Sequence, residues 1–498
     1  MSAELEARIE VPTGHRLGRR ALSLGAANAF DYALQFLVPV VLVRSLDTAA
    51  FGQYRLLGLA VGTVMAVVTM AVPGSLYYFL PRSEGATKRL YINQALVFLA
   101  AAGLIAAWAV SSWNPWLPEK MRGLAQHEAI VPLFVLLWVV ASLLDLLPTT
   151  EERVMWQAKA TVGLAALRAV ALSLAAIVTR ELGPVLLVLL GFVALKVALL
   201  LGYVAVHHGL RGPILRWSAF ADQLRYAAPI GAAGALYGLR SQADQWVAAA
   251  LFSVSMFASF SIATVLGPLV HLCRQSVFHT ILPSLSRLQA AGDIRGMLKL
   301  NSRASVMVGA LVYPLLAFAF AFAEEIVTII YTAAYVDAVP VMRVFMVGFA
   351  GLVVDLGSTM LVLRQGAYMM RVSLVTLVVS VALSWFSAHA FGLAGAAVGS
   401  VTAVFVDYVV ILRRIALCTG IPVRQLKDWR TLGLLILSAV LAAAIAWSMA
   451  DRYFAASGPL VRLVFGGVVL AAVYAAMAAL VGVGRGWLAA VRDPGHGL

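Results

Sequence analysis

The sequence predicts an all-α integral membrane protein with about fourteen transmembrane helices, arranged as two related six-helix lobes and two further helices. The chain has 498 residues, 62% of them hydrophobic and 12% charged, with a mean hydropathy of +0.92. These values lie far outside the averages of soluble proteins. Apolar segments of transmembrane length recur along the whole chain, and the first part of the sequence is echoed in the second.

Taken in order, the apolar segments alternate with short polar connections. Since about 20 apolar residues span a bilayer, we expect transmembrane segments at 21–43, 55–80, 90–112, 129–148, 158–179, 183–206, 224–251, 256–282, 303–323, 338–362, 368–389, 391–417, 431–450 and 459–483. These segments predict a cytoplasmic tail 1–20, a first lobe 21–206, a cytoplasmic linker 207–223, a second lobe 224–417, two C-terminal helices within 418–483 and a cytoplasmic tail 484–498.

The basic residues predict the topology. A formal net charge of +14 could indicate nucleic acid binding, but cytoplasmic loops of membrane proteins are also rich in Lys and Arg. With the amino terminus inside, about 26 of the 37 Lys and Arg residues fall in cytoplasmic connections and about 7 in external ones. This skew favours a multi-pass membrane protein with both termini in the cytoplasm, and it explains the net charge without a nucleic acid partner.

An internal repeat relates the two predicted lobes. Three pairs of stretches match in order: 25–30 with 231–236, 51–54 with 257–260, and 80–81 with 282–283. The first two pairs share an offset of 206 residues, and six helices separate the copies, so both lobes have the same orientation. Such lobes are related by an axis along the membrane normal, an arrangement known in transporters.

Several cations lie inside the apolar segments. A charge at mid-membrane costs about 2.5–3.5 kcal/mol on insertion scales, so it usually faces a protein interior or a wet cavity. We single out Arg168, Lys196, Arg240, Arg274 and, nearer an external end, Arg343. One interpretation is a cationic cavity between the lobes that binds an anionic group, because the arginine fork suits phosphate. The other is pairing of each cation with a buried acid, which for Arg240 could be the neighbouring Asp244.

The buried acids Asp31, Asp244, Asp355 and Asp407 are the counterparts of these cations. A carboxyl group in a low dielectric can take up and release a proton during transport, and it can equally pair with a nearby arginine. Asp31 is the first candidate for proton coupling, because it lies mid-helix with no cation within four residues.

Signals of soluble enzymes are missing from the sequence. There is no Walker loop and no cluster of metal ligands, so neither a cofactor nor a catalytic residue is expected. Cys273 and Cys418 lie near predicted cytoplasmic ends, where a disulfide is not expected. The longest external connection, 113–128, is too short for an inserted domain. These observations favour a transporter over an enzyme.

Residues 23–25 and 46–55, followed by Leu80-Pro81-Arg82, resemble the polysaccharide-flippase branch of the multidrug/oligosaccharidyl-lipid/polysaccharide (MOP) superfamily, and specifically O-antigen repeat-unit flippases of the Wzx type. The most telling piece is an acidic residue, small residues and then Phe-Gly-x-Tyr, here Asp47 to Tyr54. The stretches 243–246 and 252–261 resemble the start of the second lobe. The resemblance covers helices 1–2 and 7–8 and extends to the remainder only by topology.

This resemblance implies a V-shaped, multi-pass transporter of the bacterial cytoplasmic (inner) membrane. It would flip a polyprenyl-diphosphate-linked oligosaccharide, a polysaccharide or O-antigen repeat unit, from the inner to the outer leaflet by alternating access. Its cationic central cavity would bind the anionic headgroup, and the last two helices could form a groove for the lipid tail. The implied partners are the lipid-linked glycan, membrane lipids, a polysaccharide polymerase and a chain-length regulator. The candidate substrate-binding residues are Arg240, Asp244, Arg168, Lys196, Arg274 and Arg55, and the candidate coupling residues are Asp31, Asp355 and Asp407.

Other functions stay open at this stage. A cation-coupled exporter of drugs or metabolites is one alternative, although such exporters of this superfamily usually have twelve helices and acid-lined sites. A flippase for the peptidoglycan precursor lipid II is another. A polysaccharide polymerase or ligase is less favoured, because those enzymes tend to present a large external loop.

Overall fold

The computed structural model describes residues 14–116, 119–125, 127, 129–209 and 212–480, and this part of the chain is helical without a β-strand. The predicted all-α fold class is therefore confirmed. The helix α2 begins at Gly14 and thus includes the end of the predicted cytoplasmic tail 1–20. The predicted tail 484–498 lies outside the described residues.

The chain divides into two compact units, Met1–Ala235 (unit 1) and Leu236–Leu498 (unit 2), and the boundary falls inside α11. The helices that begin in unit 1 are α2 (Gly14–Ser45), α3 (Thr48–Val68), α4 (Val72–Phe79), η1 (Leu80–Arg82), α5 (Gly85–Ala109), η2 (Glu119–Met121), α6 (Arg122–Ala125), α7 (Ile130–Ala141), η3 (Ser142–Asp145), α8 (Leu147–Thr150), α9 (Val154–Thr179), α10 (Leu182–His208) and α11 (Trp217–Leu251). The helices of unit 2 are α12 (Val254–Ala263), α13 (Gly267–Ala290), α14 (Ile294–Ala321), α15 (Ala323–Ile330), η4 (Ala333–Tyr335), α16 (Ala338–Leu352), α17 (Gly357–Val362), α18 (Gly366–Thr419), α19 (Val423–Leu426), α20 (Trp429–Phe454) and α21 (Pro459–Leu480).

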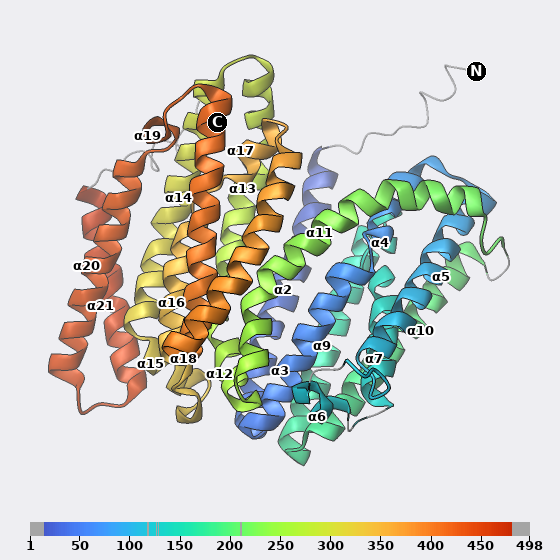
Figure 1. Ribbon diagram of the computed structural model, residues 1–498, viewed down its shortest axis with the longest axis horizontal. Helices are drawn as coiled ribbons and strands as arrows, with labels where there is room; N and C mark the ends of the chain where they lie inside the picture. Colours follow the sequence, from blue (N-terminus) through green and yellow to red (C-terminus); the bar gives the residue numbers. More distant parts are fainter. Residues whose placement is uncertain (1–13, 117–118, 126, 128, 210–211, 481–498) are drawn as a thin grey trace. The chain divides into compact units, whose positions relative to one another are not determined.

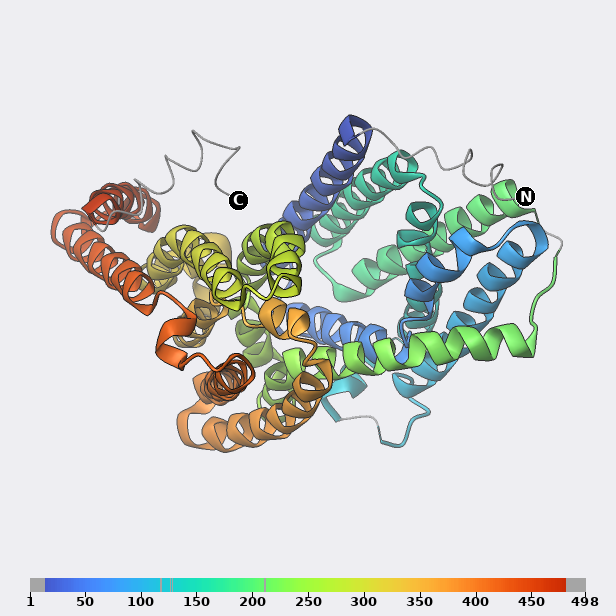
Figure 2. The same ribbon diagram turned by 90° about the horizontal axis from the view of Figure 1, so that it is seen from above.

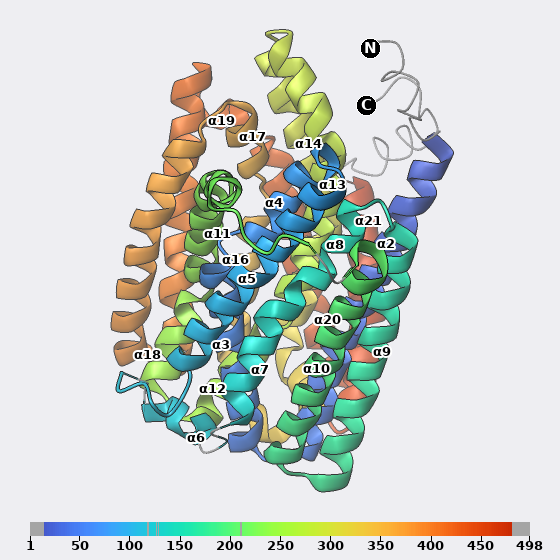
Figure 3. The same ribbon diagram turned by 90° about the vertical axis from the view of Figure 1, so that its right-hand side faces the viewer.

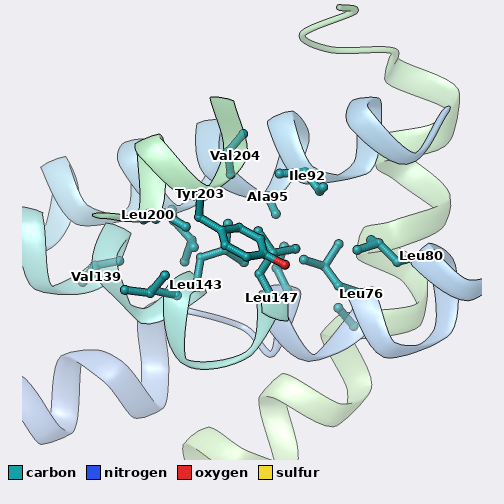
Figure 4. Packing of buried hydrophobic residues seen from close by; sticks show 14 residues of the cluster. Leu76, Leu80, Ile92, Ala95, Val139, Leu143, Leu147, Leu200, Tyr203 and Val204 are labelled. Atoms are coloured by element: carbon teal, nitrogen blue, oxygen red, sulfur yellow. The ribbon is translucent and has the colours of Figure 1, made fainter. Parts of the chain in front are cut away.

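Unit 1 is a bundle in which α2 packs along α9, and α7 packs between α5 and α10 (Figures 1 and 3). Its core contains Leu76, Ile92, Leu143, Leu200 and Tyr203, which come from α4, α5, η3 and α10 and are almost fully buried. Figure 4 shows the Tyr203 ring among these aliphatic side chains. Close packing of this kind fixes the helix ends around it, including the end that carries Glu151.

Unit 2 is built around α14, which contacts α13, α16 and α20. The last two described helices, α20 and α21, lie side by side at the outside of this unit (Figures 1 and 2). They correspond to the two helices predicted beyond the second lobe.

Twelve of the described helices are long and apolar enough to cross a membrane. One of them, α18, contains two predicted segments, because the backbone leaves the helical conformation at Phe391 and Gly392. Gly392 has a φ of 62°, which glycine adopts without the cost of a Cβ clash. The chain reverses there, so that Gly395 and Gly399 face Ser387 and Ser384. Since α11 also coincides with a predicted segment but is not among the twelve, the exact count of fourteen stays a prediction.

The repeat is visible in the local structure of the first two helices of each unit. The carboxylate of Asp47 caps α3 by accepting from the amide of Ala50, and the hydroxyl of Ser253 caps α12 by accepting from the amide of Met256. Both cap residues are separated by the 206-residue offset found in the sequence. The third sequence match behaves differently, because Pro81 lies in the short η1 whereas Pro283 lies inside α13.

Two predicted transmembrane segments are interrupted at informative places. Segment 55–80 is broken at Met70 and Ala71, whose φ angles of 46° and 54° are unusual for residues with a side chain. Gly231 of α11 packs against this break so closely that a Cβ there would lie 2.4 Å from the Met70 carbonyl carbon. Segment 338–362 is broken between α16 and α17, and the break contains Asp355. Interrupted helices that expose backbone groups are a feature of transporter binding sites.

Candidate functional site

The cation of α11 pairs with an acid of α18. A guanidinium nitrogen of Arg240 lies 2.7 Å from Oδ2 of Asp407, and the hydroxyl of Thr376 donates to Oδ1 of the same carboxylate at 3.2 Å. Asp407 and Thr376 come from the two antiparallel halves of α18. The hairpin therefore holds the carboxylate, and the carboxylate orients Arg240.

Asp244 lies one helical turn further along α11 than Arg240, and like Arg240 it faces α18. Its side chain is 6% exposed and accepts hydrogen bonds from the amide of Gln245 and from Ser400. The described ion pairs include none between Arg240 and Asp244, so the local pair suggested by their spacing is wrong. The spacing does put both side chains on one face, as four residues on a helix require.

A second ion pair of unit 2 lies at the break between α16 and α17. A guanidinium nitrogen of Arg274 on α13 lies 3.5 Å from Oδ1 of Asp355, and another lies 3.5 Å from Nδ1 of His271. The other carboxylate oxygen of Asp355 accepts from the amide of Ser358 at the start of α17. Because Asp355 binds both Arg274 and the first turn of α17, a movement of Arg274 would alter the contacts at this helix break.

Tyr408 of α18 lies within electrostatic range of both ion pairs of unit 2. The charges of Arg274, Asp355, Asp407 and Arg240 all act on its hydroxyl group, and we refer to these four side chains as the charge network. The formal charges of the two arginines and the two carboxylates sum to zero. Four of the residues predicted for binding or coupling thus come together in one unit, although they are spread over more than 160 positions of the sequence.

Asp31, the first coupling candidate, also has a cationic partner. Its Oδ1 lies 2.9 Å from a guanidinium nitrogen of Arg168 on α9, and its Oδ2 accepts from Gln35 at 2.8 Å. The absence of a cation within four residues was therefore misleading, because the cation comes from a neighbouring helix. The charges of Arg168 and Arg55 both act on Tyr54, which places Asp31, Arg168 and Arg55 in one region of unit 1.

The remaining two predicted cations have separate environments. Lys196 on α10 lies 2.8 Å from Oδ2 of Asp145, and its ammonium group sits 5.5 Å from the centre of the Trp138 ring. Arg343 donates to the backbone carbonyl of Phe320 at 3.2 Å. The second interpretation from the sequence, in which each cation pairs with an acid, therefore holds for four of the cations: Arg168, Lys196, Arg240 and Arg274.

The sequence analysis missed three polar residues that the fold brings to these groups. Asp145 was overlooked although it interrupts an apolar segment, which was a usable signal. Thr376 carried no such signal, because threonine is common in membrane helices. Lys427 lies in a loop of the sequence and yet is 6% exposed, with its ammonium group bonded to Asn301, Ser305 and the carbonyl of Asp355.

The pairs differ in which member is accessible. In unit 2 the arginine side chains are 22% exposed and their carboxylate partners 7% and 5%. In the Arg168–Asp31 pair of unit 1 the carboxylate is the more exposed member, because the Arg168 side chain is 19% exposed and the Asp31 side chain 28%. An anionic ligand that approaches the unit 2 network would meet guanidinium groups first. Arginine can hold a phosphate oxygen pair through two parallel hydrogen bonds.

Comparisons with solved structures support the fold. The lipid II flippase MurJ in an inward closed conformation superposes with a TM-score of 0.68 at 11% identity, covering 92% of this chain and 98% of that chain. An inward-facing multidrug resistance transporter of the MATE family superposes with a TM-score of 0.57 at 12% identity, covering 78% of this chain and 96% of that chain. A MOP superfamily transporter from Pyrococcus furiosus gives 0.52 at 14% identity, covering 80% and 95%.

A comparison of sequences identifies the family. No curated protein sequence matches the chain. The family described as polysaccharide biosynthesis protein matches residues 41–340, which is more than half of the chain and extends from the end of α2 into α16. The chain therefore belongs to the polysaccharide biosynthesis protein family and is a multi-pass inner-membrane protein with the transporter fold of the MOP superfamily.

Proposed function

We propose that this protein flips a polyprenyl-diphosphate-linked oligosaccharide from the inner to the outer leaflet of the cytoplasmic membrane by alternating access. The family match supports a role in polysaccharide biosynthesis, and the fold supports transport. The observation that carries the choice of an anionic substrate is the charge network of unit 2. There Arg240 and Arg274 are the accessible members of two ion pairs, which suits a diphosphate with its multiple acceptor oxygens.

The same network supports a role for protons. While Asp407 is ionised, it occupies the guanidinium group of Arg240. Protonation of the carboxylate would weaken this pair and leave the guanidinium free to bind a phosphate oxygen. Release of the headgroup would let the carboxylate lose its proton and recapture the arginine. Binding of the substrate and of the proton would thus favour each other, a coupling that must act in both directions.

The experiment that tests the substrate is depletion of the protein in its native host, followed by lipid extraction and glycan analysis of the polyprenyl-linked fraction. We expect one diphosphate-linked oligosaccharide to accumulate while surface polysaccharide falls. Complementation with the wild-type chain should reverse both effects. The variant Arg240→Gln should not reverse them. The matched control Arg343→Gln should, because the described contacts of Arg343 are with the backbone carbonyl and the ring of Phe320 and include no carboxylate.

Other outcomes would redirect the proposal. Accumulation of lipid II would assign this chain the substrate named for its structural relative MurJ. Surface polysaccharide reduced to single repeat units would indicate a polymerase. If no lipid-linked glycan accumulates and sensitivity to toxic cations rises, a drug exporter is the better description.

A further inference from the structure

A cavity outside the charge network lies within unit 1. It has a volume of about 390 Å³ and is lined by Gly85, Lys88, Arg89, Glu151, Arg153, His207 and His208. These residues come from the start of α5, the turn before α9 and the end of α10. All three places were predicted from the sequence to be cytoplasmic ends, and the fold brings them together.

The lining is strongly basic. Lys88, Arg89 and Arg153 supply three full positive charges against the single carboxylate of Glu151, which leaves a formal charge of +2 before either histidine is protonated. Burial opposes ionisation of Glu151, but hydrogen bonds from His208, Tyr203 and Lys88 outweigh it and lower its pKa from 4.5 to about 2. The acid therefore stays ionised at every physiological pH and cannot offset more than one cation.

Glu151 is fully occupied by its neighbours. Its oxygens lie 3.1 Å from Nζ of Lys88, 2.7 Å from Nε2 of His208 and 2.5 Å from the hydroxyl of Tyr203, and its side chain is 4% exposed. The Tyr203 ring belongs to the core of unit 1 (Figure 4). The described ion pairs of Glu151 therefore involve Lys88 and His208 and neither arginine of the cavity.

The two arginines of the cavity have hydrogen-bonding capacity to spare. Arg89 is 9% exposed, its Nε has no hydrogen-bond partner among the described residues, and one terminal nitrogen makes a long 3.4 Å contact with the carbonyl of Val204. The guanidinium of Arg153 is exposed and lies 5.8 Å from the centre of the Tyr203 ring, without a carboxylate partner in the described part of the chain. A buried guanidinium with an unused donor is costly unless a ligand completes it.

We propose that this cavity binds a phosphate or diphosphate group at the cytoplasmic end of unit 1. Arginine forks bind phosphate oxygens through paired hydrogen bonds, and lysine adds a point charge. The volume of about 390 Å³ accommodates a headgroup rather than a single small ion. Its source is either an anionic lipid of the cytoplasmic leaflet, which such basic clusters attract, or a soluble phosphate compound.

A ligand in this cavity would connect three elements of unit 1. Arg89 belongs to α5, Arg153 immediately precedes α9, and His207 lies in the last turn of α10. Gly212, which precedes α11, also packs on this site, because a Cβ there would lie 2.8 Å from Cγ of Arg89. Occupancy should therefore stabilise the cytoplasmic end of the unit. This inference does not depend on the proposed transport activity.

The first arm of the test uses the purified full-length protein in a neutral detergent, with inorganic diphosphate as the probe and calorimetric titration as the measurement. The informative variant is Arg153→Gln, which removes a cation that has no acidic partner and so preserves the Glu151 contacts. The matched control is Arg216→Gln, an exposed arginine of the same predicted cytoplasmic side that does not line the cavity. We expect binding to the wild type and the control, and about tenfold weaker binding to Arg153→Gln.

The second arm separates the two sources. The wild type and both variants are placed in nanodiscs of phosphatidylglycerol or phosphatidylcholine, and retained lipid is counted by native mass spectrometry. Selective retention of phosphatidylglycerol that Arg153→Gln abolishes identifies a lipid headgroup as ligand, whereas diphosphate binding without such retention identifies a soluble one. If Arg153→Gln and Arg216→Gln behave alike in both arms, the proposal is wrong, and the basic residues of the cavity serve only to orient the chain in the membrane.

Discussion

Arg240 and Asp407 show why a buried pair must be tested as a pair. Removal of Arg240 leaves a carboxylate that is 7% exposed without its cation, and breaking a buried ion pair in this way typically costs about 3–5 kcal/mol. We therefore expect Arg240→Ala to lower the thermal stability of the protein markedly. The double variant Arg240→Ala with Asp407→Asn should recover much of this loss, because no uncompensated charge remains.

Thermal unfolding in detergent measures both variants, and a vesicle transport assay follows for the double variant. A double variant that is as unstable as Arg240→Ala would contradict the importance of the pair for stability. If the stable double variant still transports at the wild-type rate, Arg240 is structural and not part of substrate binding.

Asp31 gives a second prediction at the scale of single residues. Asparagine in its place keeps the hydrogen bond to Gln35 but removes the charge that faces Arg168 and the group that could carry a proton. We expect Asp31→Asn to flatten the pH dependence of transport in proteoliposomes. Asp145→Asn is the matched control, since Asp145 is also paired with a cation but was not assigned to coupling. Equal pH profiles for wild type and both variants would exclude Asp31 as the coupling group.

At the scale of elements, the two halves of α18 depend on a close backbone approach. A Cβ at Gly399 would lie 2.2 Å from the backbone nitrogen of Ser384, which cannot move away without shifting the helix. We expect Gly399→Ala to destabilise the protein by about 1–3 kcal/mol, the usual cost of overpacking. Gly433→Ala in α20 is the control, because nothing lies within 4 Å of the added atom and alanine favours the helix.

The measurement is again thermal unfolding, with the Gly433→Ala variant expected to match or exceed the wild type. Equal stability of the two variants would mean that the hairpin tolerates a wider spacing. It would also weaken the assignment of Asp407 and Thr376 to one site, since that site requires both halves of α18.

For the molecule as a whole, Lys427 joins the final helices to the rest of unit 2. It immediately precedes Asp428, the cap of α20, and bonds Asn301 and Ser305 of α14 and the carbonyl of Asp355. Burial lowers the pKa of this lysine from 10.5 to about 7, against the opposing charge of Asp355. Between these values the unfolded chain binds more protons than the folded protein, so the free energy of unfolding should rise with pH.

We expect the Tm of the wild type to increase from about pH 7 to about pH 9, and this increase to disappear in Lys427→Met. Lys299→Met, which replaces an exposed lysine of α14, should retain the wild-type slope. Identical slopes in all three proteins would show that Lys427 does not titrate in this range. Lys427 links the start of α20 to Asp355 of the charge network. A transport assay of Lys427→Met therefore shows whether this link affects transport.

The sequence by itself determined the all-α fold class, the approximate positions of most membrane-length segments and several of the charges inside them. Hydrophobic segments of helical length and the distribution of Lys and Arg are properties of the chain that do not depend on which helices become neighbours. The repeat was visible for the same reason, since the caps at Asp47 and Ser253 are local structures. An unpaired charge in an apolar segment is costly wherever it lies, so Arg168, Arg240 and Asp31 could be recognised without a structure.

The partners of these charges were decided only by the tertiary structure. Arg240 pairs with Asp407, 167 positions away, and Arg168 with Asp31, 137 positions away, so no local spacing could have predicted either pair. Lys427 and the basic cavity around Glu151 are further cases, because their residues occupy connections that read as ordinary cytoplasmic loops. Burial and electrostatic pairing depend on which helices pack together, and that is a property of the folded chain alone.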